Sequence, residues 1–144
     1  MHQFTLGGDQ HERVTVVVTG YERQPTGDYH DDNWLNTEVE LMVGAFRGRY
    51  QFSTQASEFE SFLAQLSALY PSLVGVAEFF TLEGQLALRL EGNSGGAIEL
   101  TGVAVDVPGT GNRLSFSLSL DQTNLKQAIG GLARVVEAFP VRAS

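Results

Sequence analysis

The feature that most constrains the fold is a strict alternation of apolar and polar residues along residues 113–120. Every second position is apolar, and arginine or serine fills the positions between them (Leu114, Phe116, Leu118 and Leu120, against Arg113, Ser115, Ser117 and Ser119). Because successive side chains of a β-strand point to opposite faces, this segment predicts a strand with one buried and one solvated face. Strands of this kind are typical of antiparallel sheets. We therefore expect the core to be built on antiparallel β-structure.

The same alternation recurs along most of the chain. It is present in residues 85–91 and around Val14, Val16 and Val18, which follow a shorter apolar pattern at Phe4 and Leu6. The two N-terminal patterns predict a hairpin that turns at residues 7–10. Short glycine-rich links then predict a four-strand meander over residues 74–82, 85–91, 96–107 and 112–120.

Two longer segments change the parity of their apolar positions at a glycine. The change falls at Gly44 within residues 38–52 and at Gly102 within residues 97–107. In a continuous strand, an offset of one residue would send one apolar set into water. We therefore predict a β-bulge or sharp coil at each of these two glycines, which bends the sheet around its core.

Two segments show the period of an amphipathic helix. The first covers residues 57–70, where Ser57 and Glu60 form a possible capping box and Pro71 prevents continuation. The second covers residues 123–139, with Asp121 or Thr123 as N-cap. Its Gly130-Gly131 pair indicates either a close approach of the helix backbone to a sheet or a local kink.

These elements predict a single α+β domain over residues 1–144, with two helices and about seven mainly antiparallel strands. The strands form either one curled sheet or two packed sheets, and the pattern is compatible with both. Neither the topology nor the oligomeric state follows from the sequence.

Composition and charge exclude several classes of protein. The 144 residues carry 9 basic and 17 acidic side chains, a net charge of −8, and no cysteine. An acidic surface repels phosphates, so we expect no direct binding to nucleic acid and favour a basic protein as partner. No apolar run approaches the ~18 residues of a membrane-spanning helix, so no membrane association is expected. The first residues lack the features of a signal peptide, which favours a cytoplasmic location.

No constellation of residues indicates catalysis. A cysteine nucleophile is absent, and His2, His11 and His30 are separated from one another and from any serine in a strand-to-helix elbow. Their spacing does not suit a zinc site either. We therefore predict a protein without enzymatic activity, cofactor or metal.

The densest polar cluster is an acidic and aromatic segment between two predicted strands. Aromatic anchors among steering charges are typical of protein interfaces, so we predict a partner-binding site in this segment (Asp28, Tyr29, Asp31, Asp32 and Trp34). A solvated loop ahead of a strand is the plain alternative, and Trp34 is compatible with a core position. A calcium site is disfavoured because the glycine and the terminal glutamate of a calcium loop are missing.

Two other functions remain open at this stage. The concave side of a curled sheet could bind a small molecule, with Tyr21, Tyr50 or Glu78 inside it. Alternatively, the chain could be a structural subunit that assembles through its sheet edges or helices.

The chain also resembles the WapI-type family of bacterial immunity proteins. The resemblance runs from about Val14 to Phe139 and is most distinctive where a strand leads into a helix through Asp121-Gln122-Thr123-Asn124-Leu125. Further stretches contribute to it (Asn33-Trp34-Leu35, Gly44-Ala45-Phe46-Arg47-Gly48, Phe59-Phe62-Leu66, Gln85-Leu86-Ala87-Leu88, Gly96-Ala97-Ile98 and Leu114-Ser115-Phe116). The resemblance implies an α+β protein without enzymatic activity that acts in the cytoplasm. Its implied role is to neutralise the C-terminal toxin domain of a contact-dependent protein, often a nuclease.

Overall fold

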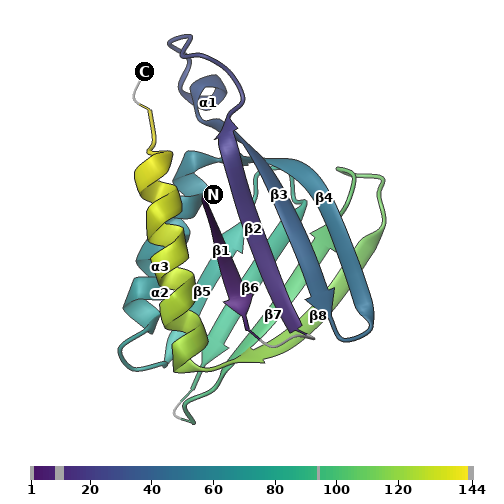
Figure 1. Ribbon diagram of the computed structural model, residues 1–144, viewed down its shortest axis with the longest axis vertical. Helices are drawn as coiled ribbons and strands as arrows, with labels where there is room; N and C mark the ends of the chain where they lie inside the picture. The colour runs from purple at the N-terminus through teal and green to yellow at the C-terminus, as the bar shows by residue number, and fades with distance from the viewer. Residues whose placement is uncertain (1, 9–11, 94, 143–144) are drawn as a thin grey trace.

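The computed structural model describes residues 2–8, 12–93 and 95–142, and shows two four-stranded antiparallel sheets that face each other (Figure 1). The first sheet has the order β1-β2-β3-β4 (His2–Gly7, Glu12–Tyr21, Trp34–Val43 and Phe46–Gln55). The second has the order β5-β6-β7-β8 (Gly75–Phe80, Leu86–Gly92, Ile98–Val105 and Arg113–Leu120). The predicted α+β class is confirmed, and the two-sheet arrangement is the one adopted.

Three helices complete the described structure: the single turn α1 (Tyr29–Asp32), α2 (Ala56–Leu69) and α3 (Gln122–Ala138). The two longer helices lie within one residue of their predicted positions. Asp121, one of the two predicted N-caps, is the N-cap of α3. Its side chain accepts a hydrogen bond from the N–H of Asn124 at 2.8 Å. The capping box predicted from Ser57 and Glu60 is wrong, because α2 begins earlier. No described helix is long and apolar enough to cross a membrane.

The core fills the space between the two inner sheet faces and is closed on one side by the helices. Four phenylalanine rings join the layers: Phe4 of β1, Phe59 and Phe62 of α2, and Phe79 of β5, with ring centroids 5.2–6.1 Å apart in the contacting pairs. All four are at most 1% exposed. Their burial contributes roughly 2 kcal/mol per side chain and fixes α2 between the sheets.

The helices also cover one edge strand of each sheet. The side-chain amide of Gln65 in α2 donates to the carbonyl of Glu78 at 3.2 Å and accepts from its N–H at 2.9 Å, which satisfies the backbone of Glu78 at the edge of β5. On the other sheet, α3 lies against β1, and an added Cβ on Gly131 would be only 2.5 Å from the carbonyl oxygen of Gln3. The glycine pair has two interpretations, and the first applies at Gly131: the backbone of α3 approaches the sheet closely there.

The structure contradicts the prediction of a bulge at Gly44. Val43 pairs with Phe46, and Gly44 begins the two-residue turn that joins β3 to β4, with φ of +65°. A glycine with positive φ at the first position of such a turn matches a type II′ hairpin. The parity changes because the chain reverses direction, and this turn raises the strand number to eight.

The bulge predicted at Gly102 is also wrong. β7 runs through this residue without a register shift, and Gly102 lies between Leu88 and Phe116 of the neighbouring strands. Gly102 continues the inward-facing set of Ile98, Leu100 and Ala104, while Val103 and Val105 lie on the outer face. An added Cβ would lie 2.4 Å from the Phe116 ring, so the glycine makes room for that ring.

The sheets contain one irregularity that the sequence did not indicate. The pairing of β2 with β3 shifts register between Val18 and Gly20. This shift lies directly before the segment that leads into the predicted partner-binding residues.

Candidate partner-binding site

Four of the five predicted partner-binding residues lie in the connection between β2 and β3, at one end of the first sheet, and the fifth, Trp34, begins β3 (Figure 1). At the base of this connection, the N–H of Glu22 donates to the carbonyl of Trp34 at 2.9 Å. We call residues 22–33 the acidic loop; it contains the single helical turn α1.

Asp32 is the internal acceptor of the acidic loop. Its carboxylate accepts from the N–H and the hydroxyl of Thr26 at 2.6 and 2.8 Å, and from the N–H of Gly27 at 2.9 Å. The side chain is only 2% exposed. Burial alone would raise the pKa of Asp32, but the bonds from Thr26 and Gly27, together with the nearby Arg142 guanidinium, hold the pKa below its usual value. Asp32 thus shapes the loop, and its carboxylate is turned away from the surface.

The other two aspartates lie nearer the solvent. Asp28 is the N-cap of α1 and accepts from the N–H of Asp31 at 3.0 Å. The Asp31 carboxylate lies 3.5 Å from the guanidinium of Arg23, and half of its side chain is exposed. Ion pairs at such exposed positions are weak, so the carboxylate remains available to another cation.

The two aromatic residues occupy different environments. Tyr29 is 40% exposed, and its ring meets that of His30 edge to face with centroids 5.4 Å apart. Trp34 begins β3, is half-buried, and pairs with Gln55 at the end of β4. Tyr29 is therefore the aromatic side chain that the loop presents to solvent, and Trp34 contributes to its base.

The end of the chain forms one wall of the site. The Arg142 guanidinium carbon lies 3.4 Å from the centroid of the Tyr21 ring, and the same guanidinium donates to the carbonyl of Arg23 at 3.2 Å. The Tyr21 hydroxyl donates to the carbonyl of Pro140. Sequence reasoning did not find Arg142, because it lies far from the acidic segment in the chain and belongs to no motif.

The acidic loop and Arg142 together hold four carboxylates and two guanidiniums, so the site keeps a net negative charge (Glu22, Asp28, Asp31 and Asp32, against Arg23 and Arg142). Each aspartate has a different set of partners. Within the described residues, no three side chains of metal-ligating type come together. The geometry suits attraction of a basic partner better than chelation.

The three residues considered for a small-molecule site do not converge. Tyr21 contacts Arg142, whereas the Tyr50 hydroxyl donates to the carbonyl of Gln85. Burial, with a smaller contribution from Asp106, raises the pKa of Tyr50 to about 12. Glu78 lies on the outer face of the second sheet, paired with Arg89 at 3.3 Å. The structure thus places these groups in three separate environments.

Comparison with known proteins gives one assignment. No curated protein matches the chain. A family model does match, over residues 5–140, and this range contains both sheets except for the first residues of β1, all three helices and the whole acidic loop. The chain therefore belongs to the immunity protein WapI-like family.

Proposed function

We propose that this chain is the immunity protein of a toxin system and acts by binding, without catalysis, to a cognate toxin domain that has a basic surface, such as a nuclease. The family assignment carries the proposal, since immunity is the role for which the family is named. We further propose that the chain acts in the cytoplasm.

The charge of the chain supports a basic partner. Nucleases hold phosphates with Lys and Arg, and an inhibitor with a net charge of −8 is attracted to the same surface. The acidic loop places Asp28, Tyr29 and Asp31 at the surface on a base that is fixed by Asp32 and Trp34. In the proposed complex, the loop's carboxylates face cations of the toxin and Tyr29 packs against it.

The direct test is co-expression with a cognate toxin domain, sought as the C-terminal domain of a large protein encoded beside the gene for this chain. We expect the domain alone to stop bacterial growth and the wild-type chain to restore it. We also expect the purified chain to bind the domain, more weakly as salt is raised, because salt screens exposed charges. A toxic domain that the chain neither binds nor neutralises would reject the proposed function.

A further inference from the structure

The outer face of the second sheet is not covered by any described element, because α2 and α3 lie along the side of the two sheets (Figure 1). Seven large hydrophobic side chains are exposed in the described residues. Five of these belong to this sheet or to segments that flank its strands (Val74, Val76, Phe80, Leu82 and Val107). Val76 and Phe80 alternate with the buried Ala77 and Phe79, so both lie on the outer face, and exposed apolar side chains on one sheet face are typical of an interaction surface.

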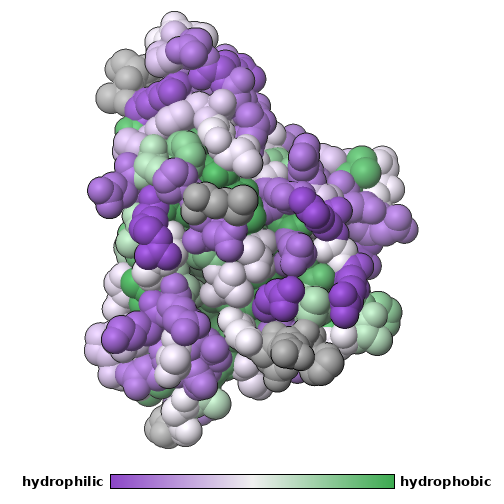
Figure 2. Space-filling view, in the orientation of Figure 1, coloured by the Kyte–Doolittle hydropathy of each residue, from purple (hydrophilic) through white to green (hydrophobic). Residues whose placement is uncertain are grey.

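The outer face of the first sheet has a different character. Its polar rows contain ion pairs between neighbouring strands, Arg49 with Glu38 and Arg13 with Glu40 at 3.6 Å. Figure 2 shows the side of the molecule on which the first sheet lies, and this side is mostly hydrophilic. Among the described residues, one exposed large hydrophobic side chain, Phe46, lies on a strand of the first sheet, against Val76 and Phe80 on β5 of the second.

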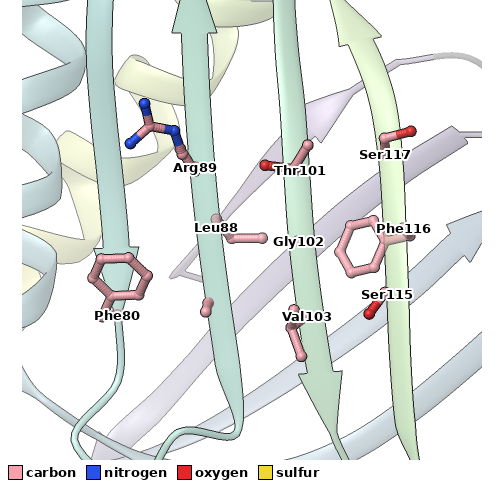
Figure 3. A pocket seen from close by; sticks show the side chains of 10 residues that line it. Phe80, Leu88, Arg89, Thr101, Gly102, Val103, Ser115, Phe116 and Ser117 are labelled. Carbon is pink, nitrogen blue, oxygen red and sulfur yellow. The ribbon is translucent and has the colours of Figure 1, made fainter.

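Strand register explains how the second sheet forms a depression. Phe80 pairs with Ala87, Ala87 with Val103, and Val103 with Ser115, so the four side chains form one row across the outer face. Small residues alternate with larger ones in this row. The result is an open depression of about 670 Å³, whose lining includes Phe80, Val103 and the backbone of Gly102 (Figure 3). We call it the outer groove.

The charges around the outer groove favour a basic occupant over an anionic one. Its one guanidinium, Arg89, already lies 3.3 Å from Glu78 and 3.6 Å from Glu91. The whole outer face has three carboxylates against two guanidiniums (Glu78, Glu91 and Glu99, against Arg89 and Arg113). A second copy of this chain would bring its own charge of −8, whereas a basic protein with an apolar side chain complements both the groove and its rim.

A short series of hydrogen bonds connects the outer groove to the acidic loop. The Gln55 side-chain amide donates to the carbonyl of His30 at 3.0 Å, and the Gln55 N–H donates to Glu58 at 2.7 Å. The second carboxylate oxygen of Glu58 accepts from the N–H of Leu82, also at 2.7 Å. Leu82 is 67% exposed and lies two residues from Phe80. Residues at the start of α2 thus link the acidic loop to the segment that follows Phe80.

We propose that the outer groove is the main docking surface for the toxin domain, which inserts an apolar side chain between Phe80 and Val103 and places basic residues against the surrounding carboxylates. This inference rests on the proposed function and extends it. The groove supplies the buried apolar contact that determines affinity, and the acidic loop supplies electrostatic steering.

The test measures binding of variants of this chain to the toxin domain that the co-expression test identifies. Phe80→Ala and Ala87→Lys are each expected to raise the Kd at least about tenfold, the first by removing the apolar wall and the second by placing a cation in the groove. Ala87→Glu adds similar bulk with the opposite charge, so its Kd should rise less than that of Ala87→Lys. Circular dichroism and thermal unfolding check that each variant is folded.

Phe46→Ala is the matched control. Phe46 is 64% exposed, close to the 58% of Phe80, but it follows the β3–β4 turn on the other sheet. Its truncation should leave the Kd within about twofold of wild type. If Phe80→Ala and Ala87→Lys bind like Phe46→Ala, the docking inference is overturned while the proposed function stands. If wild-type chain does not bind at all, the proposed function itself fails.

Sedimentation of the chain alone tests for the other occupant. We expect a monomer at all concentrations. A dimer that Phe80→Ala disrupts and Phe46→Ala does not would assign the outer groove to a second copy and overturn the inference.

Discussion

The side-chain amide of Asn33 donates to the carbonyl of Arg142 at 2.9 Å and accepts from its backbone N–H at 2.7 Å, across a separation of 109 residues. The same amide nitrogen donates to the carbonyl of Tyr29 at 2.7 Å. Asn33 therefore links the acidic loop to the end of the chain. The shape of the predicted partner-binding surface depends on a segment that contributes no residue to the acidic motif.

Replacing Asn33 by alanine should destabilise the protein. The change removes three hydrogen bonds from a side chain that is 0% exposed and leaves their backbone partners without it. We expect the free energy of unfolding to fall by about 1–3 kcal/mol, measured by urea denaturation. Asn36→Ala, at an exposed position of β3, is the control and should change stability much less. Equal losses in the two variants would contradict a linking role for Asn33.

Asp32 should make stability depend on pH in the acid range. Its pKa in the folded protein is lowered, so its ionised form stabilises the fold above the pKa of the unfolded chain, about 3.9. This contribution is lost as the pH falls through the lowered pKa. The stability difference between wild type and Asp32→Asn should be constant above about pH 5 and shrink at lower pH. A difference that stays the same down to the acid transition would show that the carboxylate charge has no such role.

Local patterns predicted most of the elements. The meander and both long helices have nearly their predicted bounds, because alternation and helical period report directly on which face is buried. Gly44 and Gly102 show where such patterns fail. A parity change looks the same whether a strand bulges, reverses direction or makes room for a neighbour, and the distinction lies in pairing partners such as Phe46 and Phe116.

The position of the candidate site was predictable from the sequence, but the different roles of its three aspartates were not. The sequence groups Asp28, Asp31 and Asp32 as equal charges. In the structure, Asp32 is buried because Thr26 and Gly27 turn their N–H groups toward it. The outer groove was not predicted at all, since it arises from the register of Phe80, Ala87 and Val103 on three strands. Register between strands depends on the assembled sheet rather than on any one segment.

The two adjacent glycines of α3 should respond in opposite ways to alanine. A methyl group on Gly131 would lie 2.5 Å from the carbonyl oxygen of Gln3 and 3.0 Å from Cα of Phe4, so Gly131→Ala must push α3 away from β1. We expect Gly131→Ala to lower the free energy of unfolding by about 1–3 kcal/mol. An added Cβ on Gly130 would have only the Arg134 guanidinium nearby, at 3.8 Å. Gly130→Ala should therefore raise the free energy of unfolding by up to about 1 kcal/mol, because alanine has the higher helix propensity. Urea denaturation measures both, and a stabilising Gly131→Ala would refute the close contact of α3 with the sheet.

The acidic loop should control how fast the proposed complex forms. Asp28→Asn with Asp31→Asn removes two exposed charges, and asparagine keeps the N-cap of α1 because it is as good a capping residue as aspartate. At low salt we expect the association rate constant with the toxin domain to fall about two- to tenfold, with little change in the dissociation rate, because steering acts on diffusional encounter. The control removes two charges from the first sheet, Glu12→Gln with Glu40→Gln, and should have a smaller effect. Surface plasmon resonance at low and high salt gives both rates. Equal effects of the two pairs would assign the steering to the net charge of the chain, and a change confined to the dissociation rate would overturn the steering role of the loop.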